Sequence, residues 1–256
     1  MKIIKLTSLA LVLLVSGISN VKAQTADDIM QKHITAMGGV DKWNSIKTLK
    51  MTGSINAGGM EVAIKQTMVT GERMRMDMAI MGTNNFIIVT PEGGWAYMPI
   101  QPGSDKIIPL PADQVKMQKD QMNLKAGYLM DKSKIKSMQY IGNDTVNALA
   151  CYKLKVTDND GNEQTAYIDM SSYYLLRSEK KTKIQDQEQE VAVNFSNFQK
   201  LPEGIVMPMT IGSEQGDITF KTIEINKPID EKIFTPVVPA ATQDGETEPP
   251  KKEISK

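Results

Sequence analysis

Histidine and cysteine are almost absent from this sequence: among 256 residues there is one histidine, His33, and one cysteine, Cys151. Imidazoles and thiolates build most zinc, copper and iron sites, so we expect no metal site, and no motif indicates another cofactor. A lone cysteine also leaves no partner for a disulfide within the chain. The chain also has no net charge, because 30 basic residues balance 30 acidic ones. Without a positive field, nucleic acid is not an expected partner.

Catalytic motifs are equally scarce. The sequence has no Gly-x-Ser-x-Gly elbow, no Walker A loop and no His-Glu-x-x-His. His33 lies beside the apolar face of a predicted helix, which favours a packed or surface imidazole over a catalytic one. Cys151 lies in a strand-like alternation, which favours a small buried thiol over a nucleophile. A carboxylate pair for glycoside hydrolysis cannot be identified from the sequence. An enzyme therefore ranks third, after the carrier and the interaction module considered below, and we do not expect catalytic activity.

Residues 1–23 have the pattern of a secretory signal peptide. A basic start is followed by an apolar run from Leu6 to Ile18 and by Val21-Lys22-Ala23, which predicts cleavage before Gln24. The alternative, a membrane anchor, needs about 20 apolar residues, and this run has about thirteen. The residue directly after the cleavage site is Gln24, and the only cysteine lies far downstream, so lipidation is not expected. We expect a soluble, monomeric protein secreted across the inner membrane into the periplasm.

The mature chain begins with a predicted helix pair. Thr25 precedes two acidic residues as a helix cap would, and Met30, Ile34 and Met37 recur at helical spacing. Gly38-Gly39 then ends the first helix, and a second short helix is expected over 40–46. From Leu49 onward the apolar period changes to two, which indicates strands joined by glycine-containing turns.

This alternation predicts a mainly β domain over residues 24–235. About ten sequential strands with short turns imply one strongly curved antiparallel sheet, a half-open barrel, with helices at its N-terminus. The Asp158-Asn159-Asp160-Gly161 cluster is expected to be a hairpin turn, because the sixth position of a calcium loop would be Glu163 instead of glycine. From 236 to 256 the chain is rich in Pro, Thr and Glu and is expected to be a disordered tail.

The segment from Pro111 to Leu124 interrupts the strands with a predicted helix. Its apolar face is thin, which suits a helix over an opening better than a core helix. The longer segment from Pro109 to Met130 is expected to be a mobile lid. The expected lid contacts are Val115, Met117, Met122 and Leu124.

Methionine is unusually frequent: 18 Met stand against 14 aromatic residues (2 Trp, 7 Tyr and 5 Phe). Met side chains are flexible and repack around irregular partners, so a Met-lined sheet face suits an adaptable cavity for acyl chains. An ordinary core with biased composition is the open alternative. The predicted binding residues are Met51, Met60, Val62, Ile64, Met74, Met76, Met78, Trp95 and Tyr97.

Several stretches resemble a known family when they are taken in order. They are Thr25–Gly39 (TADDIMQKHITAMGG), Ile46–Gly53 (IKTLKMTG), Leu110–Met117 (LPADQVKM), Ala150–Thr157 (ACYKLKVT) and Gly204–Pro208 (GIVMP). Their order and spacing resemble the outer-membrane lipoprotein-sorting proteins, which are similar to the periplasmic carrier LolA. The resemblance covers about residues 25–235. It implies a half-open antiparallel barrel with helices over its mouth and an apolar cavity for lipid.

Together these features predict a carrier or binding protein for lipid or lipoprotein acyl chains, which passes them to an envelope acceptor protein. The alternative is an envelope interaction or assembly module without lipid cargo, in which the same face is a closed core.

Overall fold

The computed structural model describes residues 25–100, 105–184, 187–214 and 216–238. The predicted signal peptide and nearly all of the predicted tail lie outside these residues. Within the described chain, no helix is long and apolar enough to cross a membrane. The helical elements are α1 (Ala26–Ala36), α2 (Val40–Asn44), α3 (Ala112–Gln121), α4 (Leu124–Gly127) and the two short turns η1 (Lys132–Lys134) and η2 (Glu231–Phe234).

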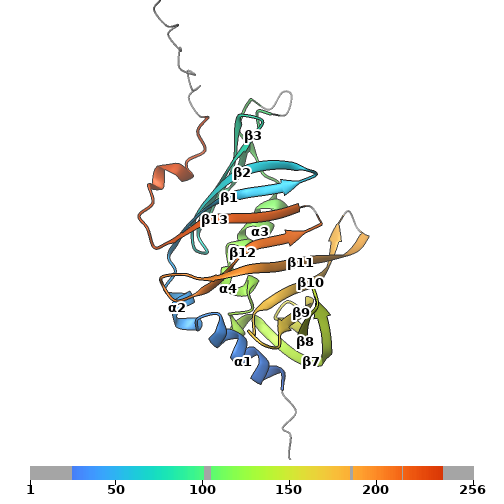
Figure 1. Ribbon diagram of the computed structural model, residues 1–256. Helices are drawn as coiled ribbons and strands as arrows, with labels where there is room; N and C mark the ends of the chain where they lie inside the picture. Colours follow the sequence, from blue (N-terminus) through green and yellow to red (C-terminus); the bar gives the residue numbers. More distant parts are fainter. Residues whose placement is uncertain (1–24, 101–104, 185–186, 215, 239–256) are drawn as a thin grey trace, which may run out of the picture.

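One antiparallel sheet of 13 strands forms the body of the protein (Figure 1). Its order is β6-β5-β4-β3-β2-β1-β13-β12-β11-β10-β9-β8-β7, so β6 and β7 are its edges and the sheet is not closed. The predicted mainly β fold with a single curved sheet is confirmed. The strands are β1 (Thr48–Ala57), β2 (Met60–Val69), β3 (Arg73–Ile80), β4 (Thr83–Thr90), β5 (Gly93–Tyr97), β6 (Ile108–Pro109), β7 (Ile135–Val146), β8 (Leu149–Asp158), β9 (Glu163–Asp169), β10 (Leu175–Ile184), β11 (Gln187–Lys200), β12 (Val206–Ser213) and β13 (Gly216–Ile225).

The expected number of about ten strands was too low, chiefly because β7 and β10 carry no clear apolar alternation. Most of β7 is exposed at the sheet edge, so burial does not select apolar residues along it. Much of β10 is charged, from Arg177 through Lys183. The expected turn between β8 and β9 is confirmed: Asp158 accepts hydrogen bonds from the backbone N–H groups of Asp160 and Asn162.

The predicted N-terminal helix pair is confirmed as α1 and α2, and α1 begins and ends as its sequence predicts. Thr25 caps α1 and exchanges hydrogen bonds with Asp28, forming a capping box. Gly38 follows α1 at φ 107°, and a Cβ atom there would lie 2.5 Å from the carbonyl oxygen of Gly204. Only glycine fits this position, so α1 packs closely against the loop before β12.

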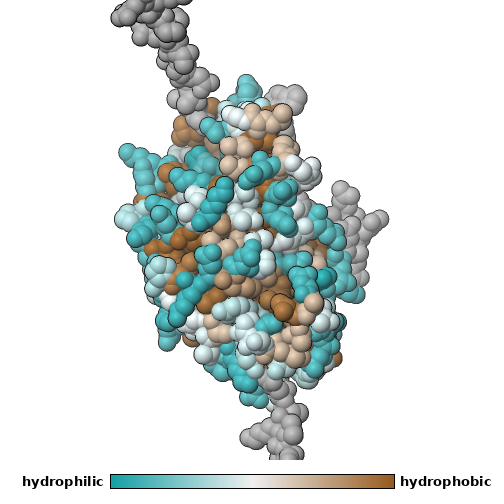
Figure 2. Space-filling view, viewed as in Figure 1, coloured by the Kyte–Doolittle hydropathy of each residue, from teal (hydrophilic) through white to brown (hydrophobic). Residues whose placement is uncertain are grey.

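The two faces of the sheet bury different clusters. The inner face carries the main core and is covered by α1, α3 and α4; the last two lie behind the strands in the view of Figure 1. The outer face is mostly polar around β1 and β13, where the hydroxyls of Thr52 and Thr222 lie 2.6 Å apart. Figure 2 shows hydrophilic side chains over most of the face it presents, with smaller hydrophobic areas between them.

Candidate functional site

The methionine-rich strands direct their apolar side chains to one common face. Opposite residues of an antiparallel pair point to the same side of a sheet. Across β1, β2 and β3 the register places Gly53 opposite Ile64, and Ile64 opposite Met78. The prediction that these side chains share a face is therefore confirmed for Met51, Met60, Val62, Ile64, Met74, Met76 and Met78.

Trp95 and Tyr97 are the exception: they lie in the same sheet, as expected, but on its opposite face. In β5 they pair with Ile88 and Phe86, and all four belong to a cluster on the outer face. The ring centroids of Phe86 and Tyr97 are 5.4 Å apart. The inner positions of β5 carry the small residues Gly94 and Ala96 instead. At Gly94, the side chains of Leu110 and Val115 fill the space above the strand.

Gly94 shows how closely α3 approaches the sheet. A Cβ atom on Gly94 would lie 2.7 Å from Cγ2 of Val115 and 3.0 Å from Cδ1 of Leu110. The backbone N–H of Leu110 also donates to the carbonyl oxygen of Gly94 at 2.9 Å. The predicted helix over the sheet is therefore present, and it is seated against β5.

The four predicted lid residues take different positions. Val115 faces the sheet and Leu124 packs partly buried against the core. Met117 points away, with 51% of its surface exposed, so its expected contact with the sheet is wrong. Met122 is only 1% exposed and belongs to the main core, so it is held more tightly than a thin-faced lid predicts.

Burial along the inner face falls off away from the helices. At the end of the sheet that the helices cover, Leu49, Met68 and Met74 are at most 1% exposed. Further along the same strands the inner side chains are only partly buried, and Met60 is 48% exposed. The apolar face thus extends beyond the helices, and its partly buried residues on β1 to β4 include Ile55, Val62, Met76, Met78 and Ile87. We call these five residues the open half of the inner face.

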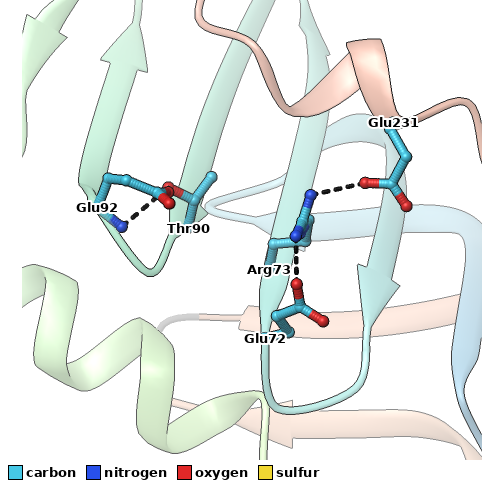
Figure 3. Close-up of polar contacts among 5 residues, drawn as sticks. All are labelled: Glu72, Arg73, Thr90, Glu92 and Glu231. Atoms are coloured by element: carbon cyan, nitrogen blue, oxygen red, sulfur yellow. Dashed lines mark hydrogen bonds and ion pairs between the residues drawn. The ribbon is translucent and has the colours of Figure 1, made fainter.

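A pocket of about 410 Å³ lies where α3 meets the turn between β4 and β5. Its lining is mainly apolar, and Glu92 and Lys119 bring charge to it. Thr90 Oγ1 donates to the Glu92 carboxylate at 2.5 Å, which lowers the pKa of that carboxyl group (Figure 3). Lys119 Nζ donates to the carbonyl oxygen of Pro91 at 3.2 Å, which ties α3 to this turn.

His33 is a packed imidazole, one of the two positions, packed or surface, that the sequence left open. Its ring is fully buried between two backbone carbonyl oxygens, with Nδ1 2.8 Å from Tyr173 O and Nε2 2.9 Å from Tyr128 O. Burial lowers the pKa of the imidazole, although both hydrogen bonds act in the opposite direction. The side chain joins α1 to the segment after α4 and to the turn between β9 and β10.

On the outer face, Arg73 and Arg75 of β3 hold η2 in place, an arrangement that we call the outer clamp and that the sequence did not predict. Arg73 lies between Glu72 and Glu231, with Nη1 2.6 Å from the Glu231 carboxylate, so η2 is held over β3 (Figure 3). Arg75 donates to the carbonyl oxygen of Ile233 at 2.9 Å. Phe234 is 4% exposed beneath these contacts. The two strand arginines are the only sequence signal, and their partners lie about 158 residues further along the chain.

The described residues offer little chemistry for catalysis. No group of three or more His, Cys, Asp or Glu side chains within them is arranged to hold a metal ion. Cys151 is buried, and burial raises the pKa of its thiol, so the thiolate is disfavoured at neutral pH.

Comparison with known proteins rests on structure alone, since no family model and no curated protein sequence matches this chain. A DUF1329 family protein from Desulfovibrio piger superposes with a TM-score of 0.53 at 16% identity, covering 83% of this chain and 98% of the other. A LolA superfamily protein from Nitrosomonas europaea gives 0.52 at 14% identity, covering 84% and 99%. The chain has a LolA-like fold. At these identities the similarity establishes the fold alone. A proposal about function must therefore be argued from the residues of the inner face.

Proposed function

We propose that this protein is a non-catalytic carrier or binding protein for the acyl chains of a lipid or lipoprotein. The observation that supports this most is the open half of the inner face, where apolar side chains of a single sheet face stay only partly buried. An ordinary closed core would bury them. The LolA-like fold supports the same reading, because its single sheet is not closed into a barrel.

The energetics favour a flexible hydrocarbon ligand. Each methylene group moved from water onto this face contributes about 0.8 kcal/mol, so a few buried methylenes suffice for useful affinity. Met76 and Met78 are unbranched and adapt their shape to a chain that has no fixed conformation. The binding residues in this proposal are Met51, Met60, Val62, Ile64, Met74, Met76 and Met78.

In the same proposal α3 is the lid, and an envelope acceptor protein or membrane competes for the chains when α3 moves. None of the side chains of α3 itself is fully buried, so the contacts that its displacement must break are chiefly those of Val115 with the sheet, Lys119 with Pro91 and Met122 with the core. The signal-peptide pattern of residues 1–23 supports a periplasmic location.

Two neighbouring substitutions test the proposed site. Met78 lies on the inner face and Ala79 lies exposed on the outer face of the same strand. Titration with a fluorescent fatty-acyl probe should show at least tenfold weaker binding for Met78→Lys, because a charge would lie against the hydrocarbon. Ala79→Lys should bind like the wild type.

Native mass spectrometry of protein purified from the periplasm should also show bound lipid. Absence of lipid together with no uptake of the probe would contradict the carrier and favour the interaction module.

A further inference from the structure

Asn85 is a buried polar residue within the apolar inner face. It lies in β4 opposite Met78 and is 1% exposed, which places its amide on the same side of the sheet as the open half. Its Nδ2 donates to the carbonyl oxygen of Thr83 at 2.9 Å and to that of Met78 at 3.5 Å. These two acceptors fix which end of the amide is nitrogen, and therefore which end is oxygen.

The amide oxygen has no hydrogen-bond partner. Oδ1 of Asn85 is buried, and among residues 25–100, 105–184, 187–214 and 216–238 no donor lies within hydrogen-bond distance of it. Unsatisfied buried oxygens are uncommon because burial removes water without supplying a replacement donor. The neighbours that share its side of the sheet are Met78 in β3 and Ile87 in β4, and both are partly exposed. Met78 lies directly opposite Asn85 and has a flexible side chain, so a ligand that displaces this side chain approaches the amide.

We propose that Asn85 Oδ1 accepts a hydrogen bond from a neutral N–H or O–H group near the polar end of the bound acyl chain. The inference rests on the proposed function and narrows its ligand class to chains with an amide or a hydroxyl near the head. An ionised fatty acid offers only acceptor oxygens there, so it would leave Oδ1 unpaired. Because Oδ1 is already unpaired without a ligand, a ligand with a donor gains a hydrogen bond there and a ligand without one gains nothing.

Matched ligands separate this role from hydrocarbon binding. N-ethylhexadecanamide carries an N–H donor, ethyl hexadecanoate has the same shape without it, and ethyl 3-hydroxyhexadecanoate carries an O–H donor. The wild type should bind the amide or the hydroxy ester at least about fivefold more tightly than the plain ester, the size expected for one neutral hydrogen bond. Whichever of the amide and the hydroxy ester binds more tightly shows whether Asn85 Oδ1 accepts from an N–H or from an O–H group.

Two variants complete the experiment. Asn85→Leu should lose the preference while keeping the affinity for the plain ester. Asn84→Leu is the control, because Asn84 is exposed on the neighbouring position of β4 and should keep the preference. The comparison of ligands on the wild type stands even if Asn85→Leu does not fold.

Equal binding of all three ligands by the wild type would overturn the inference and leave the carrier function intact. Binding of none of them would overturn the proposed function, and the inference with it.

Discussion

The Nε2 atom of His33 lies 2.9 Å from the backbone carbonyl oxygen of Tyr128, and its Nδ1 atom lies 2.8 Å from that of Tyr173. Both partners are acceptors, whereas a neutral imidazole has only one N–H to donate. A second proton would complete both hydrogen bonds, but full burial disfavours the charged ring and lowers its pKa below the usual 6.5. At neutral pH only one of the two contacts is therefore a hydrogen bond, and the other places a ring nitrogen without a proton against a carbonyl oxygen.

Acid should destabilise the protein through His33. Above about pH 6.5 the ring is neutral in both folded and unfolded chains; below it the unfolded chain binds a proton that the folded chain resists. The melting temperature should therefore fall between about pH 7.5 and pH 5. His33→Gln should cost about 1–3 kcal/mol at neutral pH, because a buried carbonyl loses its donor.

The wild type and His33→Gln must be compared for the acid-induced fall in melting temperature, because carboxyl groups titrate in both proteins. Thermal unfolding followed by circular dichroism should show a smaller acid-induced shift for His33→Gln. An identical shift in both proteins would exclude His33 as the cause.

Gly94→Ala should displace α3. The added Cβ would lie 2.7 Å from Val115 Cγ2, and such overpacking costs typically about 1–3 kcal/mol. Amide hydrogen exchange in α3 should become faster than in the wild type. Gly93→Ala is the matched control, because its Cβ would meet only the Trp95 ring, at 3.6 Å. Equal exchange in the two variants would show that the close approach at Gly94 does not seat the helix.

Met117 and Met122 of the predicted lid should respond differently to serine. Met122→Ser should cost about 2–5 kcal/mol, because it creates a cavity in the core and buries a hydroxyl. Met117→Ser should change stability by less than about 0.5 kcal/mol, since the side chain is half exposed. Urea unfolding measures both. A large effect of Met117→Ser would mean that α3 packs in solution through a face that is exposed here.

The outer clamp should support stability without affecting ligand binding. Phe234→Ala removes a buried ring under η2 and should cost about 3 kcal/mol. Below its unfolding temperature the variant should bind the acyl probe with unchanged affinity, because Phe234 and the inner face lie on opposite sides of the sheet. Val237→Ala, at a 61% exposed position of the same segment, should change neither property. Weaker probe binding by folded Phe234→Ala would mean that the two faces are coupled.

Local patterns were sufficient to predict the helix pair and the methionine strands. Thr25 and Asp28 carry a cap signature that needs only neighbouring residues, and the period of two from Met74 to Met78 reflects burial on one face. In β7 the same reasoning fails, since an exposed edge strand places no apolar demand on its sequence.

The site was only partly predictable, because pairing over long distances decides the rest. Nothing near Trp95 says which face of β5 it occupies; its pairing with Ile88 and the packing of α3 on Gly94 decide it. The burial of Asn85 and the two carbonyl partners of His33 likewise depend on segments brought together by the fold.

Nuclear magnetic resonance of isotopically labelled methionine methyl groups tests the central claim most directly, during titration with an acyl ligand. Binding on the inner face should shift the methyl signals of Met76 and Met78 with a saturable dependence on ligand. The signals of Met81 and Met117, which are 84% and 51% exposed, should stay in place. Shifts led by Met81 and Met117, with Met76 and Met78 unchanged, would mean nonspecific surface adsorption and would contradict a carrier that holds acyl chains on this face.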